Sequence, residues 1–446
     1  MRVQFSARRA ATSLTCGVLA AMIALAPAAN ADNAQYEYAT HHELGLMQGF
    51  PPAPEAQVTR DNALFGVPQN RWSYQNMRSF FPSADIAAAQ YAIDLDRAID
   101  GAIEELDITR LDGSQSDFKT YLEETFTDAL VVVKDGKVVH ESYLNGMNAD
   151  QPHQMMSVTK SFAGLFGLIA AHEGKVSEDD KVADIIPELG VSGAFGDATF
   201  GEVLDMTNSM NFTEDYADPN SGIQEYGRVL GMLPSTDANR PANTIYEYLP
   251  TLDNDDAHEH GEVFHYQTPK TDVVNWVANR ATGKSFQDNL EDVLWKKIGA
   301  DGETYVLLDS NGTLFAGGGL NATPNNLARF AAMMLNDGEV NGQEVVDPDV
   351  IQQLSDGGNI DAFSNGPESA GVMGNKDWSY RAQWWVRHTE GKEAFSAIGI
   401  HGQWIYIDVE RDVAIIKQSS QPVSKGDFFE TYDVNAFDAI VDHLSK

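Results

Sequence analysis

The chain is poor in cysteine and in basic residues. Its 446 residues include a single cysteine, Cys16, which falls in the leader described below. Because the chain after this leader has no cysteine, it can form no disulfide, no thiolate metal site and no cysteine nucleophile. Thirty Lys and Arg face 66 Asp and Glu, a formal charge of −36. Such a surface repels nucleic acid and anionic lipid, and it suits a soluble protein in salty surroundings, where screening relieves the self-repulsion.

Several familiar signatures are also missing. The chain contains no Gly-x-Ser-x-Gly, no phosphate loop, no dinucleotide fingerprint and no His-Glu-x-x-His. His258-Glu259-His260 and His265 lie in an Asp-rich loop without metal-ligand spacing, so we interpret them as solvated. We therefore expect no metal and no cofactor. Beyond the first 31 residues, no apolar run is long enough to span a membrane.

Residues 1–31 have the pattern of a cleavable signal peptide. Three arginines precede a short apolar run over residues 11–25, and the small-residue site Ala29-Asn30-Ala31 follows Pro27. The run is too short and too rich in hydroxyl residues for a membrane anchor. We expect a periplasmic or secreted protein, in which loss of the three arginines takes the charge from −36 to −39.

The rest of the chain divides into a weakly patterned N-terminal extension, 32–115, and a domain, 116–446. Within the extension, apolar residues at helical spacing predict a helix over Ile86–Leu106. Near the start of the domain, Leu130–Val133 and Val138–His140 flank a polar turn, which predicts a hairpin.

Strand patterns return only near the C-terminus. They run through Ile398–Gly402, Trp404–Ile407 and Val413–Ile416, and an amphipathic helix closes the chain. Residues from roughly 175 to 390 are predicted to form a helical insertion, in which Asn325–Leu335 is the clearest helix. These patterns predict an α/β fold, with one antiparallel sheet flanked by helices and a cleft below the insertion.

The pair with the strongest chemical potential is Ser157 and Lys160. They are three residues apart at the start of an apolar helix, so both face the same side. The helix dipole favours the negative charge of acyl transfer, and a lysine with a depressed pKa can take the serine proton. Ser116 and Lys119 have the same spacing in a charged stretch, where we expect an ordinary surface pair.

Further motifs support this pair through a resemblance. Met156–Phe162 resembles the active-site helix of the penicillin-recognising serine hydrolases, which include class C β-lactamases, family VIII esterases and 6-aminohexanoate-dimer hydrolases. Tyr266, in Phe264–Thr268, falls where that superfamily has its tyrosine motif. The segments Ala316–Leu320 and Gly399–Gln403 follow in the expected order, and the resemblance covers about residues 125–446. It implies a β-lactamase/transpeptidase-like fold.

Departures from the superfamily pattern favour one subgroup. The chain has no Lys-Thr-Gly, and Thr268 stands where Asn is usual, which disfavours a β-lactamase or D-amino-acid peptidase. The Gly399–Trp404 strand and Thr213–Tyr216 are most similar to 6-aminohexanoate-dimer hydrolases. In that family a loop tyrosine assists amide substrates, and Tyr216 is the matching residue. The alternative for Tyr216 is an aromatic packed on the surface.

The resemblance implies a serine hydrolase that acts on small-molecule carboxylic esters or linear amides. Ser157 forms the acyl-enzyme, and Lys160 and Tyr266 share the proton relay. The backbone amides of Ser157 and Ile400 stabilise the oxyanion, with Gln403 as an alternative donor. His401 either steadies this region or is purely structural.

Some questions stay open at this point. A catalytically silent binding protein on the same scaffold is the alternative from a different class of function. The natural substrate, the preference between ester and amide, the oligomeric state and the role of residues 32–115 are not determined by the sequence.

Overall fold

The computed structural model describes residues 36–235 and 242–446. The predicted signal peptide, with Cys16, lies outside the described residues. Within the described part, no helix combines the length and the hydropathy needed to cross a bilayer.

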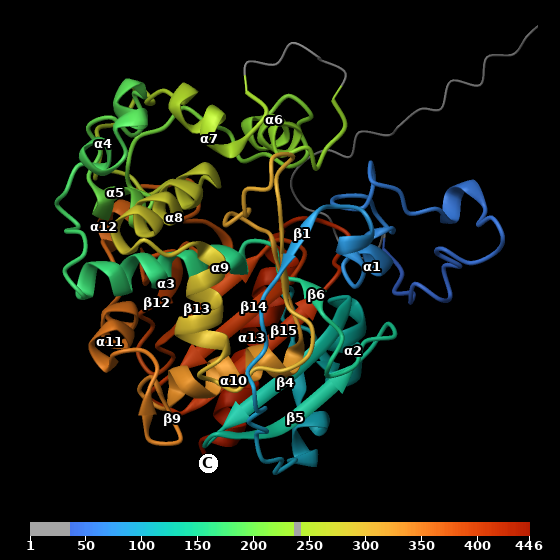
Figure 1. The fold of residues 1–446 in the computed structure, drawn as a ribbon. Helices are drawn as coiled ribbons and strands as arrows, with labels where there is room; N and C mark the ends of the chain where they lie inside the picture. The colour runs from blue at the N-terminus through green and yellow to red at the C-terminus, as the bar shows by residue number, and fades with distance from the viewer. Residues whose placement is uncertain (1–35, 236–241) are drawn as a thin grey trace, which may run out of the picture.

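The centre of the molecule is a seven-stranded antiparallel sheet in the order β11-β12-β13-β14-β15-β4-β5 (Figure 1). Both ends of the domain contribute to it, as the sequence predicts, and the hairpin and the C-terminal strands are confirmed. The strands are β4 (Thr127–Lys134), β5 (Lys137–Tyr143), β11 (Trp378–Arg381), β12 (Trp384–Arg387), β13 (Ala394–Gly399), β14 (Gln403–Asp408) and β15 (Val413–Ser419).

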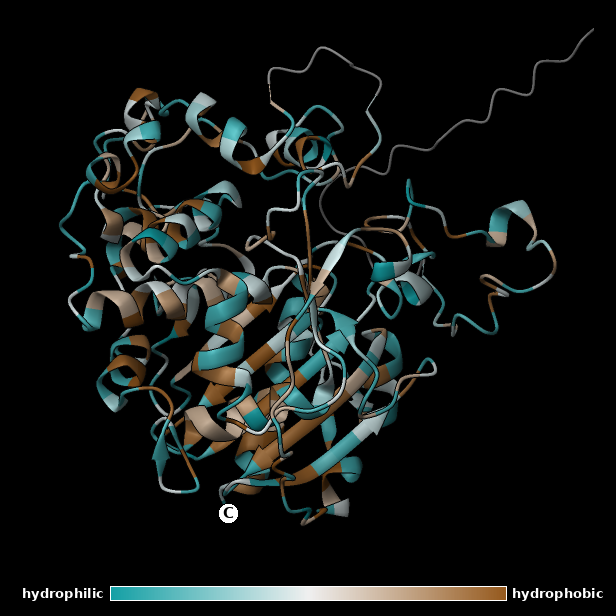
Figure 2. Ribbon diagram, viewed as in Figure 1, coloured by the Kyte–Doolittle hydropathy of each residue, from teal (hydrophilic) through white to brown (hydrophobic). Residues whose placement is uncertain are grey.

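Helices cover both faces of this sheet because its central strands are apolar on both sides (Figure 2). Successive side chains of a strand point to opposite faces. Val131, Val133 and Ile416 lie in the core that includes α3 and α10, whereas Val132 and Ile415 pack with α13. The sheet is therefore the middle layer of a three-layer α/β sandwich.

The helical elements lie on both sides of this sheet and in the lobe beside it (Figure 1). They are α1 (Asn70–Ser73), α2 (Phe118–Glu124), α3 (Val158–His172), α4 (Val182–Ile185), α5 (Phe200–Leu204), α6 (Gly222–Val229), α7 (Ile245–Tyr248), α8 (Pro269–Thr282), α9 (Phe286–Asp288), α10 (Pro324–Leu335), α11 (Pro348–Asp356), α12 (Ile360–Ser364) and α13 (Asp427–Leu444). Shorter 3₁₀ segments are η2 (Pro54–Ala56), η3 (Met77–Ser79), η4 (Gly101–Glu105), η5 (Pro187–Val191), η6 (Leu249–Thr251) and η8 (Gly371–Met373), and η7 (Asn289–Trp295) is a π-helix.

The helical insertion is smaller than predicted. Helices α4 to α8 form a lobe beside the sheet (Figure 1). The predicted range 175–390 is too wide, because β11 and β12 belong to the main sheet and α10 packs directly on β15 and β4. The short aromatic strand β11 was not predicted from the sequence, because its place at the edge of the main sheet depends on its pairing with β12.

Smaller sheets complete the fold. A four-stranded sheet in the order β1-β7-β8-β6 lies next to α3, and the pairs β2-β3 and β9-β10 stand apart from it. These strands are β1 (Ser83–Asp85), β2 (Asp107–Thr109), β3 (Gln115–Asp117), β6 (His153–Gln154), β7 (Tyr305–Leu307), β8 (Leu320–Ala322), β9 (Glu339–Val340) and β10 (Gln343–Glu344). The pairing of β6 with β8 fixes the backbone that enters α3.

The helix predicted over Ile86–Leu106 is wrong. Most of this stretch is an extended strap, and only η4 is helical. Its backbone amides are taken by distant partners: Ile86 and Ile93 donate to Thr304 and Gly299, and Ala98 donates to Val138. The helical spacing of its apolar residues was overridden because these long-range hydrogen bonds satisfy the backbone instead.

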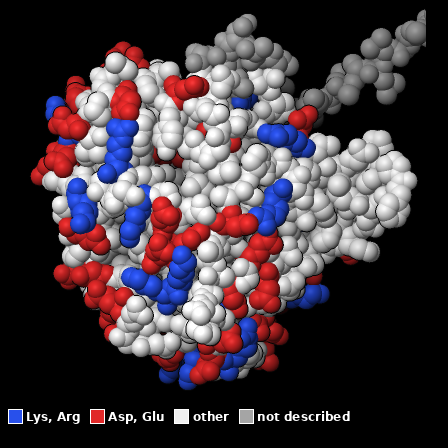
Figure 3. Space-filling view, viewed as in Figure 1, with Lys and Arg blue, Asp and Glu red and all other residues white. Residues whose placement is uncertain are grey.

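Charged residues are scattered over the face of the molecule that Figure 3 shows. Asp and Glu are spread over the domain and the lobe, with Lys and Arg between them (Figure 3). The segment 44–54 of the extension carries no charged residue, and its Phe50 is fully exposed. On this face the acidic residues are spread out and are not gathered into one patch.

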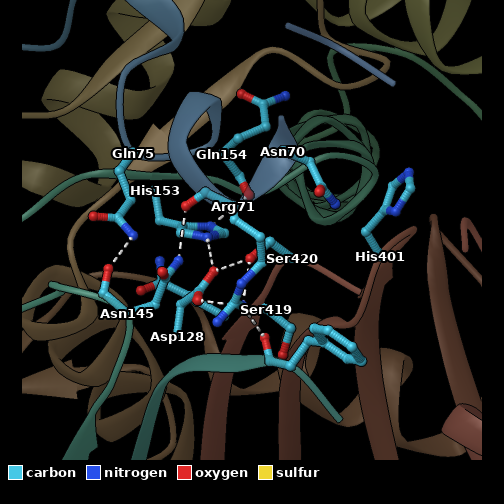
Figure 4. Close-up of polar contacts among 12 residues, drawn as sticks. Asn70, Arg71, Gln75, Asp128, Asn145, His153, Gln154, His401, Ser419 and Ser420 are labelled. Atoms are coloured by element: carbon cyan, nitrogen blue, oxygen red, sulfur yellow. Dashed lines mark hydrogen bonds and ion pairs between the residues drawn. The ribbon is translucent and has the colours of Figure 1, made fainter. Parts of the chain in front are cut away.

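A buried ion pair anchors the extension to the sheet (Figure 4). Arg71 donates to Asp128 at 2.8 Å, and both side chains are at most 2% exposed. Asp128 also accepts from His153 at 3.0 Å and from Ser420 at 2.5 Å. The charge of Arg71 opposes the effect of burial and holds the pKa of Asp128 below its usual value. The network thus joins α1, β4, β6 and the end of β15.

We expect Arg71→Ala to lower the free energy of unfolding by about 3–5 kcal/mol, because it leaves a buried carboxylate unpaired. Arg97→Ala is the matched control. Arg97 also belongs to the extension and pairs with Glu141 of β5, but this pair is solvent-accessible, with side chains that are 43% exposed for Arg97 and 27% exposed for Glu141. Arg97→Ala should cost less than about 1 kcal/mol. Urea denaturation measures both, and equal losses would contradict the assigned role of the buried pair.

Candidate active site

The candidate nucleophile lies at the first turn of α3. The chain leaves β6, turns at Met156 with a positive φ of 48°, and enters the helix at Ser157. Nearly every residue of α3 is buried, which places its N-terminus in the interior next to the main sheet. Ser157 is 6% exposed, so a small opening to solvent remains.

Lys160 lies directly beside this serine. Its Nζ is 2.8 Å from Ser157 Oγ and 2.5 Å from the carbonyl oxygen of Gly317. The lysine is 1% exposed, and burial lowers its pKa to about 8. The carboxylates of Glu214 and Asp272 act in the opposite direction and raise it. An amine with this pKa is available as a base near neutral pH.

Asp272 holds the turn that contacts Lys160. Its carboxylate accepts the Ala316 N–H at 3.1 Å and the Tyr226 hydroxyl at 2.7 Å. Burial raises the pKa of Asp272 to about 7. Asp272 was not predicted from the sequence. The available signal was an aspartate in the first turn of the otherwise largely apolar helix α8, just after the tyrosine motif.

Tyr266 completes the polar group around the serine. Its hydroxyl is hydrogen-bonded to the Ser157 side chain, and Lys160 Nζ lies 5.1 Å from its ring centroid. Burial, then the charge of Glu214, raises the pKa of Tyr266 well above its usual value. The phenol therefore keeps its proton at neutral pH and can donate it.

Two contacts fix the position of Tyr266. Its ring stacks on Trp385 with centroids 5.4 Å apart, and its backbone N–H donates to Glu368 at 3.0 Å. Burial raises the pKa of Glu368 to about 7. Neither partner was predicted, because both come from segments more than a hundred residues away.

The end of β13 lies against the nucleophile. A Cβ built on Gly399 would lie 2.5 Å from Met155 O and 3.1 Å from Ser157 N, so only glycine fits there. The next residue, Ile400, is partly exposed, and His401 is buried with a positive φ of 62°. Gly399 thus brings the end of β13, with the predicted oxyanion donor Ile400 next in the chain, close to the start of α3.

His401 and Gln403 brace this turn from behind. His401 Nδ1 contacts the Gln421 carbonyl at 2.7 Å, and burial lowers the pKa of the imidazole to about 4, so it is neutral. The Gln403 amide donates to Ser419 O at 2.6 Å and to His401 O at 3.1 Å. Its donor is therefore occupied by the backbone.

Tyr216 belongs to the same neighbourhood. Its hydroxyl donates to Glu214 at 2.7 Å, and Glu214 also accepts from the Thr268 hydroxyl and backbone N–H. Burial, then the charges of Glu214 and Tyr266, raises the pKa of Tyr216 well above its usual value. The tyrosine is partly buried and engaged in hydrogen bonding, unlike a simple surface aromatic.

Other sequence candidates lie outside this group. The surface pair predicted at Ser116 and Lys119 is wrong for Ser116, which is 7% exposed and hydrogen-bonded to Tyr432 because the β2-β3 pair packs against α13. Lys119 is 83% exposed, as predicted, and pairs with Glu123. In residues 36–235 and 242–446, the one group with metal-ligand spacing is His172, Asp347 and Asp349. It lies at the opposite end of α3 from Ser157, about 20 Å away by helix rise.

Comparisons with known proteins identify the family of the chain. The β-lactamase family model matches residues 116–439. A 6-aminohexanoate-dimer hydrolase from Paenarthrobacter ureafaciens is 34% identical over 377 residues, which cover 84% of this chain and 91% of the relative.

Solved structures show the same fold. A Bacillus anthracis protein assigned as a 6-aminohexanoate-dimer hydrolase superposes with a TM-score of 0.76 at 29% identity, over 87% of this chain and 97% of that one. A Bacteroides dorei protein assigned as a β-lactamase reaches 0.56 at 18% identity, over 74% and 97% of the two chains, and supports the fold alone. The β-lactamase/transpeptidase-like fold predicted from the sequence is thereby confirmed, and the chain belongs to the β-lactamase family of penicillin-recognising serine hydrolases.

Proposed function

We propose that this hydrolase cleaves linear amides and esters of carboxylic acids through an acyl-enzyme on Ser157. The observation that carries the proposal is the 2.8 Å contact between Ser157 Oγ and a buried Lys160 whose pKa is lowered to about 8. A serine hydroxyl is a weak nucleophile until a neighbouring base accepts its proton.

The first step uses the neutral amine of Lys160. Ser157 Oγ attacks the substrate carbonyl carbon while its proton passes to Lys160 Nζ. The carbonyl oxygen becomes an oxyanion, and the amides of Ser157 and Ile400 donate to it. The helix N-terminus at Ser157, against which Gly399 lies, supports this assignment because it favours negative charge.

The second step expels the leaving group. Tyr266 carries a proton at neutral pH and is hydrogen-bonded to Ser157. It donates this proton to the departing amine or alcohol as the carbonyl bond to that group breaks, and the proton held by Lys160 replaces it. Water then attacks the acyl-enzyme through the same two groups and releases the acid.

Two observations favour linear substrates over β-lactams. Superfamily members that hold a β-lactam carboxylate use Lys-Thr-Gly on the strand beside the nucleophile, where this chain has Gly399-Ile400-His401. His401 is buried and neutral, with its pKa lowered to about 4, so it offers no cation there. The 34% identical relative is itself a 6-aminohexanoate-dimer hydrolase.

The predicted signal peptide supports action in the periplasm or outside the cell.

We expect a fluorophosphonate to add one phosphonyl group to the wild type and none to Ser157→Ala, because only the activated serine reacts. Intact-mass spectrometry measures the adduct. Ser116→Ala is the matched control, since Ser116 has the same spacing from a lysine, and it should label like the wild type. An unlabelled wild type would favour a catalytically silent binding protein.

The labelling rate should rise with pH and reach half its maximum near pH 8, because Lys160 acts in its neutral form and its pKa is about 8. Lys160→Arg, which stays charged, should slow labelling by about 10²- to 10⁴-fold and remove this rise. The readout is the labelling rate constant between pH 6 and pH 10.

Lys270 provides the control for this profile. Burial lowers its pKa to about 7, and it donates to the carbonyls of Met206 and His265 and not to Ser157. Lys270→Met should keep a midpoint near pH 8. If the midpoint moves with Lys270 and not with Lys160, the assignment of the base is wrong.

A further inference from the structure

One turn of the N-terminal extension reaches the active-site loop, although it lies outside the 116–439 family match. The rings of Phe65 and Tyr216 pack edge to face, with centroids 5.6 Å apart and an interplanar angle of 74°. Arg60, from the same turn, donates to Gly231 O at 2.7 Å in the loop after α6. The extension therefore touches the lobe at two points beside the site.

Phe65 is held rigidly. Its neighbours Ala63 and Leu64 are buried in the main core, at 0% and 6% exposure. Their carbonyl groups accept hydrogen bonds from the Ser73 hydroxyl at 2.6 Å and the Tyr74 hydroxyl at 3.2 Å, which anchors the turn to α1. A side chain on such a support keeps its place with little loss of entropy on substrate binding.

Tyr216, in contrast, lies in the loop between α5 and α6. Its hydroxyl is fixed by Glu214 at 2.7 Å, and its ring is covered by Phe65. The two contacts hold opposite ends of the side chain. Loss of the Phe65 ring would remove the aromatic contact on one side of Tyr216 and give its ring more freedom, although Tyr216 would keep its contacts with Glu214 and with the main core.

The position of Tyr216 assigns it to the leaving-group side. Glu214 joins it to Thr268, two residues after Tyr266. Under the proposed function, on which this inference rests, Tyr266 delivers a proton to the departing amine or alcohol. Because the charge of Tyr266 acts on Tyr216, the two tyrosines are neighbours, and under that mechanism Tyr216 lies near the departing atom.

We propose that Phe65 is a positioning residue that holds Tyr216 beside the leaving group and thereby favours amides over activated esters. An amide nitrogen must gain a proton as its bond to the carbonyl carbon breaks, whereas 4-nitrophenolate departs without one. Misplacing Tyr216 should therefore slow amide cleavage selectively.

The test compares the 4-nitroanilide and the 4-nitrophenyl ester of one carboxylic acid, since the two leaving groups have nearly the same shape. In Phe65→Ala, kcat/KM for the anilide should fall about 3- to 10-fold more than for the ester, which corresponds to the usual worth of an aromatic pair. Phe65→Tyr keeps the ring and should restore the wild-type ratio. In a Tyr216→Phe background, Phe65→Ala should leave the ratio unchanged.

Phe80→Ala is the matched control. Phe80 packs edge to face on Trp72 in the same extension, with centroids 5.9 Å apart, and its loss should not alter the ratio. The rate of fluorophosphonate labelling reports Ser157 activation separately, because fluoride leaves without protonation. Phe65→Leu replaces Phe65→Ala if the latter does not fold.

Each outcome separates the two proposals. Labelling that is retained with an equal fall for anilide and ester overturns the role of Phe65 and leaves the proposed function standing. A wild type that cleaves the ester but not the anilide also overturns it, since there is then no amide activity to favour. A wild type that does not label overturns the proposed function itself.

Discussion

The removal of Lys160 from water is the constraint on which the active site depends. An ammonium loses its hydration when it is buried, so its neutral form becomes more stable and its pKa falls, here to about 8. This requires an apolar helix with buried neighbours on every side, which α3 supplies. The buried Lys160 amine also needs a hydrogen-bond acceptor besides Ser157, and the carbonyl oxygen of Gly317 is that acceptor.

The acidic groups around Lys160 limit how far burial can lower its pKa. Glu214 and Asp272 raise the pKa of Lys160, and a fully charged pair in contact with it would keep it protonated. Asp272 is itself buried, with a pKa raised to about 7, and Glu214 is occupied by three donors from Tyr216 and Thr268. The site therefore keeps the amine close to the point at which it changes charge near neutral pH.

The geometry of the site is assembled from distant segments. The proposed nucleophile follows β6, the strand proposed to lead to the oxyanion donor is β13, and the turn at Gly317 precedes β8. The extension braces this assembly, because Tyr74 packs on His401 and accepts the Gln154 N–H, while Asn70 donates to Gln421 O at 2.9 Å. Figure 4 shows Asn70, Gln154 and His401 among these side chains. The extension is thus part of the site's support and not an appendage.

The sequence by itself determined the features that rest on local order. Period-two and helical patterns predicted the hairpin of β4 and β5, the C-terminal strands and α3, and the three-residue spacing placed Ser157 and Lys160 on one face. The tertiary structure decided the rest. The strap at 86–100 is extended because distant carbonyls take its amides, and Asp272, Glu368 and Phe65 reach the site only through contacts across the fold. Such contacts leave no periodic trace in a sequence. The pKa of Lys160 belongs to this second group as well, because it reflects how much water the folded chain excludes.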